Sequence, residues 1–218
     1  ERLVGRTLRA LARQAPEGSE LLVVDGGSRA RTVEIARRHA RVLESPRGRG
    51  VQLARGAAAA AGDVLLFLHA DARLGDRAIP ALLDTLERGR ADYGGFRQRI
   101  LGRHPLYRVI ERWADFRCRA LGQFFGDSGL FVRASAYRAA GGFPEWPLFE
   151  DVEISARLRR AGLRRTLLDE PIHISARRWE DRGIVRATVT NWWLQARYRC
   201  GARPEALLPH FPPIGPAS

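Results

Sequence analysis

The segment Asp63–Asp71 constrains the fold of this chain more than any other. Its sequence, DVLLFLHAD, holds five consecutive apolar residues, Val64–Leu68, followed at once by His69, Ala70 and Asp71. An apolar run of this length predicts a strand that is buried on both faces, as in a parallel sheet. In open α/β folds, ligands bind beyond the carboxyl ends of such strands. Asp71 is therefore a candidate catalytic or metal-binding residue, although a cap of the next helix would also explain it.

Apolar periodicity elsewhere predicts an alternation of strands and helices, which is typical of an α/β fold with a mostly parallel sheet and flanking helices. Strands are expected at 21–24, 41–44, 64–68, 93–100, 129–132 and 164–168. Helices are expected at 3–15, 32–40, 51–61, 76–88, 104–120, 134–140, 150–160 and 183–199, before an irregular tail over 204–218. The chain starts in a helix with no strand before it, whereas a doubly wound sheet ordinarily opens on a strand.

The charge of the chain bears on its partners. The net charge is +13, and all 37 basic residues are arginines that are spread along the whole sequence. Because they form no single basic block, we do not expect a nucleic-acid partner; anionic ligands, such as a nucleotide diphosphate or an acidic membrane surface, fit the charge as well. No apolar run approaches the ~20 residues that span a bilayer, and no signal peptide is recognisable. Two isolated cysteines fit a reducing cytoplasm.

Two glycine-containing turns are candidate ligand-binding loops. Asp25-Gly26-Gly27-Ser28 follows a predicted strand, so its glycines would permit close approach to a ligand and Asp25 could accept hydrogen bonds from a base or ribose. An ordinary turn before a helix explains it equally well. Gly48-Arg49-Gly50 lacks the third glycine of a dinucleotide fingerprint, since Leu53 stands there. A nicotinamide cofactor is therefore not expected.

Carboxylates and arginines gather in the second half. Glu150 and Asp151 open a predicted helix, where the macrodipole stabilises negative charge. Either could be a general base that is kept ionised at neutral pH by a depressed proton affinity, or both could simply stabilise the helix terminus. The segment Ser175–Glu180, SARRWE, combines two guanidiniums suited to a diphosphate with an indole that could stack on a sugar, or it is a solvated turn. Trp192 and Trp193 are expected to pack against the sheet.

In this order, the motifs resemble those of the inverting glycosyltransferases of family 2, which have the GT-A fold. The resemblance rests on VVDGGS at 23–28, LFLHAD at 66–71, GGFPEWPLFEDVEIS at 141–155 and SARRWE at 175–180. Together with FFGDSGLFVR at 124–133, it is closest to a bacterial subgroup, the radical-SAM/selenodomain-associated transferase 2 proteins. It implies one GT-A domain over 1–200, with a nucleotide-binding half at 1–100 and an acceptor half at 101–200, followed by the tail at 201–218.

The resemblance also implies a role for individual residues. The donor would be a uridine or guanosine diphosphate sugar. Its binding residues would be Asp25, Gly26, Gly27, Ser28, Arg49, Gln52, Ala70, Asp71, Arg177 and Arg178. Asp71 would bind Mg²⁺ or Mn²⁺, which would stabilise the charge of the leaving diphosphate. Asp151, with Glu150 beside it, would deprotonate the acceptor hydroxyl. Asp127 and Trp179 would lie on the side of the unknown acceptor.

The chain departs from the family pattern in several places. His69 takes the first acidic position of the metal motif, Ala30 and Ala54 replace an aspartate and an asparagine, and Ser128 replaces a glutamine. The family's first strand is also absent. These departures keep two alternatives open: an inactive relative that acts as a peripheral membrane or scaffold protein, and a nucleotidyltransferase. The expected location is the cytoplasm, with contact at the inner face of an anionic membrane.

Overall fold

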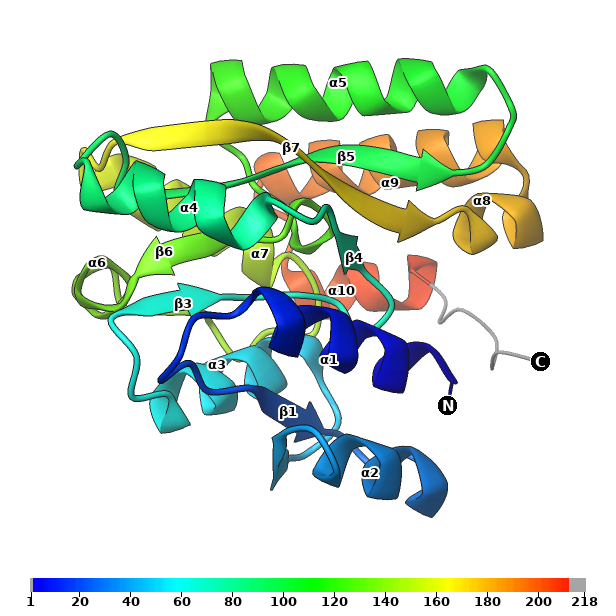
Figure 1. Cartoon of the computed structure of the whole chain (residues 1–218). Coiled ribbons are helices and arrows are strands. Elements are labelled where there is room, and N and C mark those ends of the chain that lie inside the picture. The colour runs from blue at the N-terminus through cyan, green and yellow to red at the C-terminus, as the bar shows by residue number, and fades with distance from the viewer. Residues whose placement is uncertain (1, 212–218) are drawn as a thin grey trace.

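The computed structural model describes residues 2–211 and forms a mixed α/β fold whose strands lie in two sheets (Figure 1). The larger sheet has the order β3-β6-β5-β7-β4, formed by β3 (Val64–Leu66), β6 (Phe131–Arg133), β5 (Tyr93–Leu101), β7 (Arg165–Ser175) and β4 (Arg73–Leu74). The smaller sheet pairs β1 (Leu22–Asp25) with β2 (Arg41–Glu44). Among the described residues, β1 pairs only with β2 and β3 only with β6, so the two sheets are not joined.

The expected mixture of strands and flanking helices is confirmed, but the sheet is less parallel than expected. The pairs β1–β2 and β5–β7 are parallel, whereas β6 is antiparallel to both β3 and β5, and β4 is antiparallel to β7. Apolar periodicity gives the face that a strand buries but carries no information on its direction. Direction depends instead on the connections, and β6 enters the sheet between two strands that precede it in the chain.

Strand β3, which was expected to be buried on both faces, is shorter and more exposed than its sequence suggests. It ends at Leu66, and of its residues only Leu65 is buried. Its position at the edge of the sheet explains the difference, because it has one strand neighbour rather than two. The two following residues, Phe67 and Leu68, continue as irregular backbone toward His69.

Strand β7 is longer than its apolar pattern predicted. The expected strand stopped at Leu168, since Asp169, Glu170 and Pro171 interrupt the pattern. The structure continues the strand to Ser175 and shifts its register against β5 between Phe96 and Arg97. A register irregularity at this place accommodates a proline, which has no N–H for the ladder.

The eight expected helices are present with small shifts at their ends, whereas α8 and η1 were not expected. The first half holds α1 (Arg2–Gln14), α2 (Ala30–Arg37), α3 (Arg49–Ala59) and α4 (Ala78–Glu87). The second half holds α5 (Leu106–Leu121), the short η1 (Gly126–Ser128), α6 (Ala134–Ala139), α7 (Glu150–Arg160), α8 (Arg177–Arg182) and α9 (Ile184–Arg199). The segment SARRWE is therefore largely helical rather than a turn.

The tail was expected to be irregular, but α10 (Pro204–Leu207) and η2 (Leu208–His210) are helical. Leu207 is buried in a small core with Phe149 of the α7 entrance and Leu194 of α9. The remainder of the expected tail, 212–218, lies outside the described residues. The tail up to Phe211 thus packs on the same helices that lead to the candidate site.

Two larger cores cover the sheet. One packs α4 and the indole of Trp179 against Phe96 and Ile172 of the central strands. The other packs α6 and α7 against Tyr93 and Val132. Trp192 and Trp193 belong to neither core: they are 50% and 46% exposed, so the expectation that they pack against the sheet is wrong. The helical spacing of α9 turns them outward, while Ala187 and Leu194 are buried instead.

The start of α3 packs closely against the loop that precedes α7. Gly48 has a φ of 154°, and a Cβ at Gly50 would lie 2.4 Å from the carbonyl oxygen of Pro144 and 2.6 Å from that of Trp146. The glycines of Gly48-Arg49-Gly50 therefore permit a backbone-to-backbone contact. This contact brings Arg49 next to the first residues of α7.

We expect Gly50→Ala to destabilise the protein by about 1–3 kcal/mol, because the added methyl group meets immobile backbone and outweighs the better helix propensity of alanine. Gly56→Ala in the same helix is the matched control, since its methyl group would meet only the Cγ2 of Val24, at 3.0 Å. Urea unfolding of both variants measures the difference. Equal stability of the two variants would contradict the close packing of the α3 entrance.

Candidate functional site

Arg49, the first residue of α3, links the segments on which the sequence prediction rests. Its Nε lies 3.0 Å from Oε1 of Glu150, and its Nη2 lies 3.4 Å from Oδ2 of Asp151. The same Nη2 lies 3.0 Å from Nε2 of His69. A single guanidinium thus joins the HAD segment after β3 to the carboxylate pair at the start of α7.

The entrance of α7 has an unusual backbone. Phe149, immediately before the helix, has a φ of 66°, a left-handed conformation that bulky residues rarely adopt. Its ring stacks on Tyr198 of α9, with centroids 4.7 Å apart. Strained backbone of this kind persists where packing determines it, and it often occurs at functional sites. Here it starts the helix so that Glu150 and Asp151 both contact Arg49.

The two carboxylates have different surroundings. Glu150 is 1% exposed, and its contact with Arg49 is an ion pair without hydrogen-bond alignment. Asp151 is better satisfied: the Gly126 N–H donates to its Oδ2 at 2.9 Å, and the Val152 N–H donates to its Oδ1 at 2.8 Å. Asp151 also keeps a side chain that is 13% exposed. Of the two, Asp151 is therefore the carboxylate that can meet a substrate.

Glu150 does not follow the expectation of a depressed proton affinity. Burial, and then the negative charge of Asp151, raise its pKa to about 7, although Arg49 opposes the shift. The stabilising effect of a helix N-terminus is small next to the cost of removing a carboxylate from water. Glu150 thus changes its protonation state near neutral pH.

The HAD segment contributes a neutral imidazole and a free carboxylate. Burial, and then the charge of Arg49, lower the pKa of His69 to about 3, so the ring is neutral at physiological pH. Asp71 lies in an exposed turn and forms no ion pair or hydrogen bond with any residue of 2–211. It does not cap a helix, because β4 intervenes and α4 begins only at Ala78. The capping interpretation of Asp71 is therefore wrong.

The donor set around Asp71 fits a divalent cation only in part. Within the described chain, no three His, Cys, Asp or Glu side chains come together in a way that could hold a metal ion. Nε2 of His69 faces the guanidinium of Arg49 rather than an open position. One free carboxylate and no second protein ligand make a weak site, because Mg²⁺ and Mn²⁺ are bound by several oxygen atoms. Ligand oxygens would have to complete it.

The SARRWE segment supplies one arginine to the site. Burial, and then the positive charge of Arg49, lower the pKa of Arg178, and the charges of Asp127 and Asp71 act on it in the opposite direction. Its guanidinium lies over the ring of Phe211, 4.6 Å from the centroid. Arg177 has its Nε 3.7 Å from Oδ2 of Asp181, one turn further along α8. Arg178 is thus a partly desolvated cation near the free carboxylate.

Trp179 does not lie where the resemblance placed it. Its indole is 8% exposed and packs in the main core, edge-to-face with Tyr107 at 5.9 Å between ring centroids. An indole that is buried in this way does not offer its face for stacking on a sugar. Asp127 remains on the surface of the site: its side chain is 38% exposed, with Oδ1 3.8 Å from Nη2 of Arg117.

The turn after β1 lies beside α3. The N–H groups of Gly27 and Ser28 both donate to the Asp25 carboxylate, at 3.2 and 3.0 Å. A hydrogen bond from the Ser28 side chain is the main cause that lowers the pKa of Asp25, and it outweighs burial. Gln52, one turn after Arg49, donates to the Val24 carbonyl at 2.8 Å and closes the space behind Gly26. The turn is thus a compact structure held by its own aspartate.

Sequence reasoning missed the backbone N–H of Gly126, the strained Phe149 and the buried Arg117. A Cβ at Gly126 would overlap Nη2 of Arg49 and lie 2.9 Å from Nε2 of His69, so a larger residue there would displace the guanidinium. Arg117 lies over the ring of Phe125, 3.4 Å from its centroid. The glycine of GDSG was a usable signal for a close approach, whereas nothing in the local sequence marks Phe149 or Arg117.

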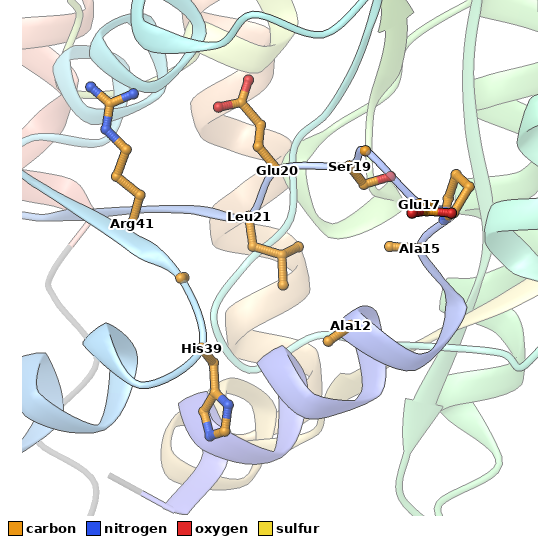
Figure 2. A pocket seen from close by; sticks show the side chains of 11 residues that line it. Ala12, Ala15, Glu17, Ser19, Glu20, Leu21, His39 and Arg41 are labelled. Atoms are coloured by element: carbon orange, nitrogen blue, oxygen red, sulfur yellow. The ribbon is translucent and has the colours of Figure 1, made fainter.

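A cavity of about 640 Å³ lies away from this cluster, between the end of α1 and the beginnings of β1 and β2 (Figure 2). Figure 2 shows that its polar side chains diverge, with His39 turned away from Glu20 and Arg41. Glu20 already accepts a hydrogen bond from the Ala61 N–H. A ligand site needs polar groups that converge, so we assign chemistry to the Arg49 cluster and not to this cavity.

Comparison with known proteins gives a family model and several solved structures. Residues 1–140 match the family model described as Glycosyl transferase family 2. No curated protein matches the sequence. S. aureus TarS 1–349 is similar, with a TM-score of 0.64 and 17% identity over 80% of this chain and 57% of TarS 1–349. The same protein in complex with UDP-GlcNAc gives a TM-score of 0.63, 16% identity, and coverage of 80% and 55%.

A second similar structure is the mannosyltransferase PcManGT from Pyrobaculum calidifontis in complex with GDP-Man and Mn²⁺. Its TM-score is 0.65, with 18% identity over 96% of this chain and 64% of PcManGT. The chain therefore spans less than two thirds of the length of these proteins. At such identities the likeness establishes a shared fold, whereas the chemistry must be argued from the site.

The titration of Glu150 predicts a dependence of stability on pH. Its folded-state pKa of about 7 exceeds the ordinary value of 4.5, so the folded protein binds the proton more tightly. The stabilising contribution is complete below pH ~4.5 and is lost as the pH rises through 7. The lowered pKa of His69 acts in the opposite direction up to pH ~6.5, so we expect the free energy of unfolding of the wild type to fall over this window relative to that of Glu150→Gln, which shares His69.

Urea unfolding at pH 5, 6, 7 and 8 measures this fall. Glutamine does not titrate, so the free energy of unfolding of the wild type minus that of Glu150→Gln should decrease from pH 5 to pH 8. Glu153→Gln is the matched control on the same helix: its pKa is lowered rather than raised. A difference between wild type and Glu150→Gln that stays constant with pH would refute the assignment.

Proposed function

This chain belongs to glycosyltransferase family 2, and we propose that it transfers a sugar from a nucleotide-diphosphate donor to an acceptor hydroxyl with inversion. The observation that carries the proposal is the convergence of Arg49, His69 and the Glu150–Asp151 pair, with Arg178 and Asp71 close by. The guanidinium of Arg178, which has no ion-pair partner among residues 2–211, suits a diphosphate. The partly exposed carboxylate of Asp151 suits proton abstraction. We propose residues 1–200 as the transferase domain.

The donor end of the site is assigned to the turn Asp25–Ser28, to Asp71 and to Arg178. TarS and PcManGT are solved with UDP-GlcNAc and with GDP-Man, so we propose a uridine or guanosine diphosphate sugar as the donor. Arg178 would contact the diphosphate. As the bond between the anomeric carbon and the diphosphate oxygen breaks, the leaving group takes the electron pair, and a guanidinium stabilises the added negative charge.

The acceptor end is assigned to Asp151. The acceptor hydroxyl would donate its proton to this carboxylate while its oxygen attacks the anomeric carbon opposite the leaving group, which inverts the configuration. The Gly126 N–H and Arg49 hold the carboxylate in place. Glu150 forms an ion pair with Arg49 on the buried side of the guanidinium. Because Glu150 is buried, we propose it as a positioning residue rather than the base.

A divalent cation would use Asp71 together with oxygens of the diphosphate, and it would add further positive charge at the leaving group. The Mn²⁺ in PcManGT supports this assignment. Because Asp71 is a single ligand, we expect Mg²⁺ or Mn²⁺ to bind with the donor rather than alone. No observation favours a nucleotidyltransferase or an inactive scaffold over a transferase, and the cytoplasmic location stays a prediction.

Donor binding tests the first half of the proposal. Calorimetry with uridine and guanosine diphosphate sugars, with Mn²⁺ present, should detect one nucleotide class that binds. Arg178→Gln should weaken that binding by ~10–100-fold, the equivalent of a lost hydrogen bond to a charged group. Arg177→Gln, which removes a neighbouring arginine paired with Asp181, should change it little. Absence of binding by every donor would refute the proposed function.

The base assignment predicts a separation of binding and turnover. Asp151→Asn should reduce transfer by ~10²–10⁴-fold while the donor affinity stays within about threefold, since asparagine keeps the shape of the side chain but cannot take the proton. Donor hydrolysis or transfer assays give the rate, and calorimetry gives the affinity. Asp169→Asn, an exposed carboxylate of β7, serves as the control. Loss of affinity and rate together would make Asp151 structural.

A further inference from the structure

Helices α5 and α9 share an exposed apolar surface that the proposed function does not use. We call it the α5–α9 ridge. Its residues are large, apolar and between 45% and 64% exposed: Val109, Trp113, Phe116, Val185, Val189 and Trp192. A group of exposed large apolar side chains on one face commonly marks an interaction surface.

The ridge is continuous across the two helices. Its residues recur at spacings of three and four on each helix, which places them on one outward face. Trp113 of α5 lies 5.5 Å from Phe116 and 6.0 Å from Trp192 of α9, measured between ring centroids. Figure 1 shows α5 running along the outside of the sheet, with α9 behind β5 in this view. The three aromatic rings therefore form the centre of the ridge.

The edges of the ridge are basic. Arg112 of α5 and Arg186 and Arg197 of α9 are exposed and make no ion pair with any residue that the structure describes. Their helical positions put them beside the apolar residues, Arg112 on the flank of α5 away from α9, and Arg186 and Arg197 on the flank of α9 away from α5. These arginines can therefore meet an anionic partner.

Neither helix offers a free carboxylate in return. Helix α9 contains no acidic residue. The acidic residues of α5 are Glu111, which is 4% exposed and contacts Arg108, and Asp115, which contacts Arg97. The exposed Asp169 of β7, near the end of α5, lies 3.0 Å from Arg119. The exposed charged side chains of α5 and α9 themselves are thus all arginines.

This charge pattern distinguishes a membrane from a second copy of the chain. A symmetric pairing of two ridges would place the unpaired arginines of one copy against those of the other, with no carboxylates to compensate. An anionic bilayer supplies phosphate groups for the arginines and an interfacial zone that favours tryptophan rings. No helix within residues 2–211 is long and apolar enough to cross a membrane, so any contact would be interfacial.

We propose that the α5–α9 ridge binds the surface of an anionic lipid bilayer, with its aromatic rings in the headgroup region and its arginines on the lipid phosphates. Helix α8, which carries Arg178 of the candidate site, is joined to α9 through Gly183 alone. Attachment through α9 would therefore hold the transferase site at the membrane surface. The proposal does not depend on the identity of the donor or on activity.

Vesicle sedimentation tests the proposal. The probes are vesicles of phosphatidylcholine alone and of phosphatidylcholine with phosphatidylglycerol, at low and at high salt. We expect the wild type to bind the anionic vesicles at low salt, with a blue shift of its tryptophan emission. Binding to the neutral vesicles should be at least about tenfold weaker, and high salt should weaken the anionic binding by a similar factor.

The double variant Trp113→Ser, Trp192→Ser should lose at least about tenfold in its affinity for anionic vesicles. Trp193→Ser is the matched control: this ring is 46% exposed but lies against His210, with centroids 5.3 Å apart, and not against Trp113. It should bind as the wild type does. Circular dichroism verifies folding, and Val109→Ser with Val185→Ser repeats the test if the tryptophan variant does not fold.

Three outcomes would overturn the proposal. The first is a wild type that does not bind anionic vesicles or that binds neutral vesicles equally well. The second is a folded ridge variant that binds like the wild type. The third is a concentration-dependent dimer in sedimentation velocity that the ridge variant abolishes, which would make the ridge an interface between two copies.

Discussion

The candidate site depends on one guanidinium that is held between three partners. Arg49 contacts Glu150 and Asp151, which lie about 100 positions later in the chain, and His69, which lies 20 positions later. None of these contacts is possible unless α3 begins directly against the loop before α7, and Gly50 permits that approach. Separating a buried carboxylate from its ion-pair partner costs more free energy than the intact pair contributes to stability. The cluster therefore fixes the relative positions of these segments.

The same guanidinium divides the tasks of its neighbours. It faces Nε2 of a neutral His69, so this ring nitrogen is not available to a ligand. Asp71 is then the residue of the HAD segment that can meet a ligand. Arg49 also contacts Glu150, whose burial raises its pKa to about 7, while Asp151 stays at the surface and is held by backbone N–H groups. Two adjacent carboxylates of similar chemistry thus differ in proton affinity and accessibility because their surroundings differ.

Much of the fold could be predicted from periodicity, but directions and edges could not. The helix Glu150–Arg160 and the strand Arg41–Glu44 were predicted at their observed bounds. Strand β3 was expected to be parallel and buried on both faces, and it is an antiparallel edge strand, because its pairing depends on connections far along the chain. For the site, the sequence named Arg49 and Asp151, which the structure places in contact, whereas the burial of Trp179 could not be read from a local motif.

The sequence by itself determined the α/β class, the family resemblance and the chemical types available at the site, since these depend on residue identity and local spacing. Only the tertiary structure decided which of these residues meet. In the folded chain Asp71 does not cap a helix, Trp179 is buried in the core, and Glu150 forms an ion pair with Arg49. The tertiary structure also turned Trp113 and Trp192 outward onto one ridge. The reason is physical: proton affinity, burial and exposure depend on neighbours that the chain supplies from distant positions, and only folding brings them together.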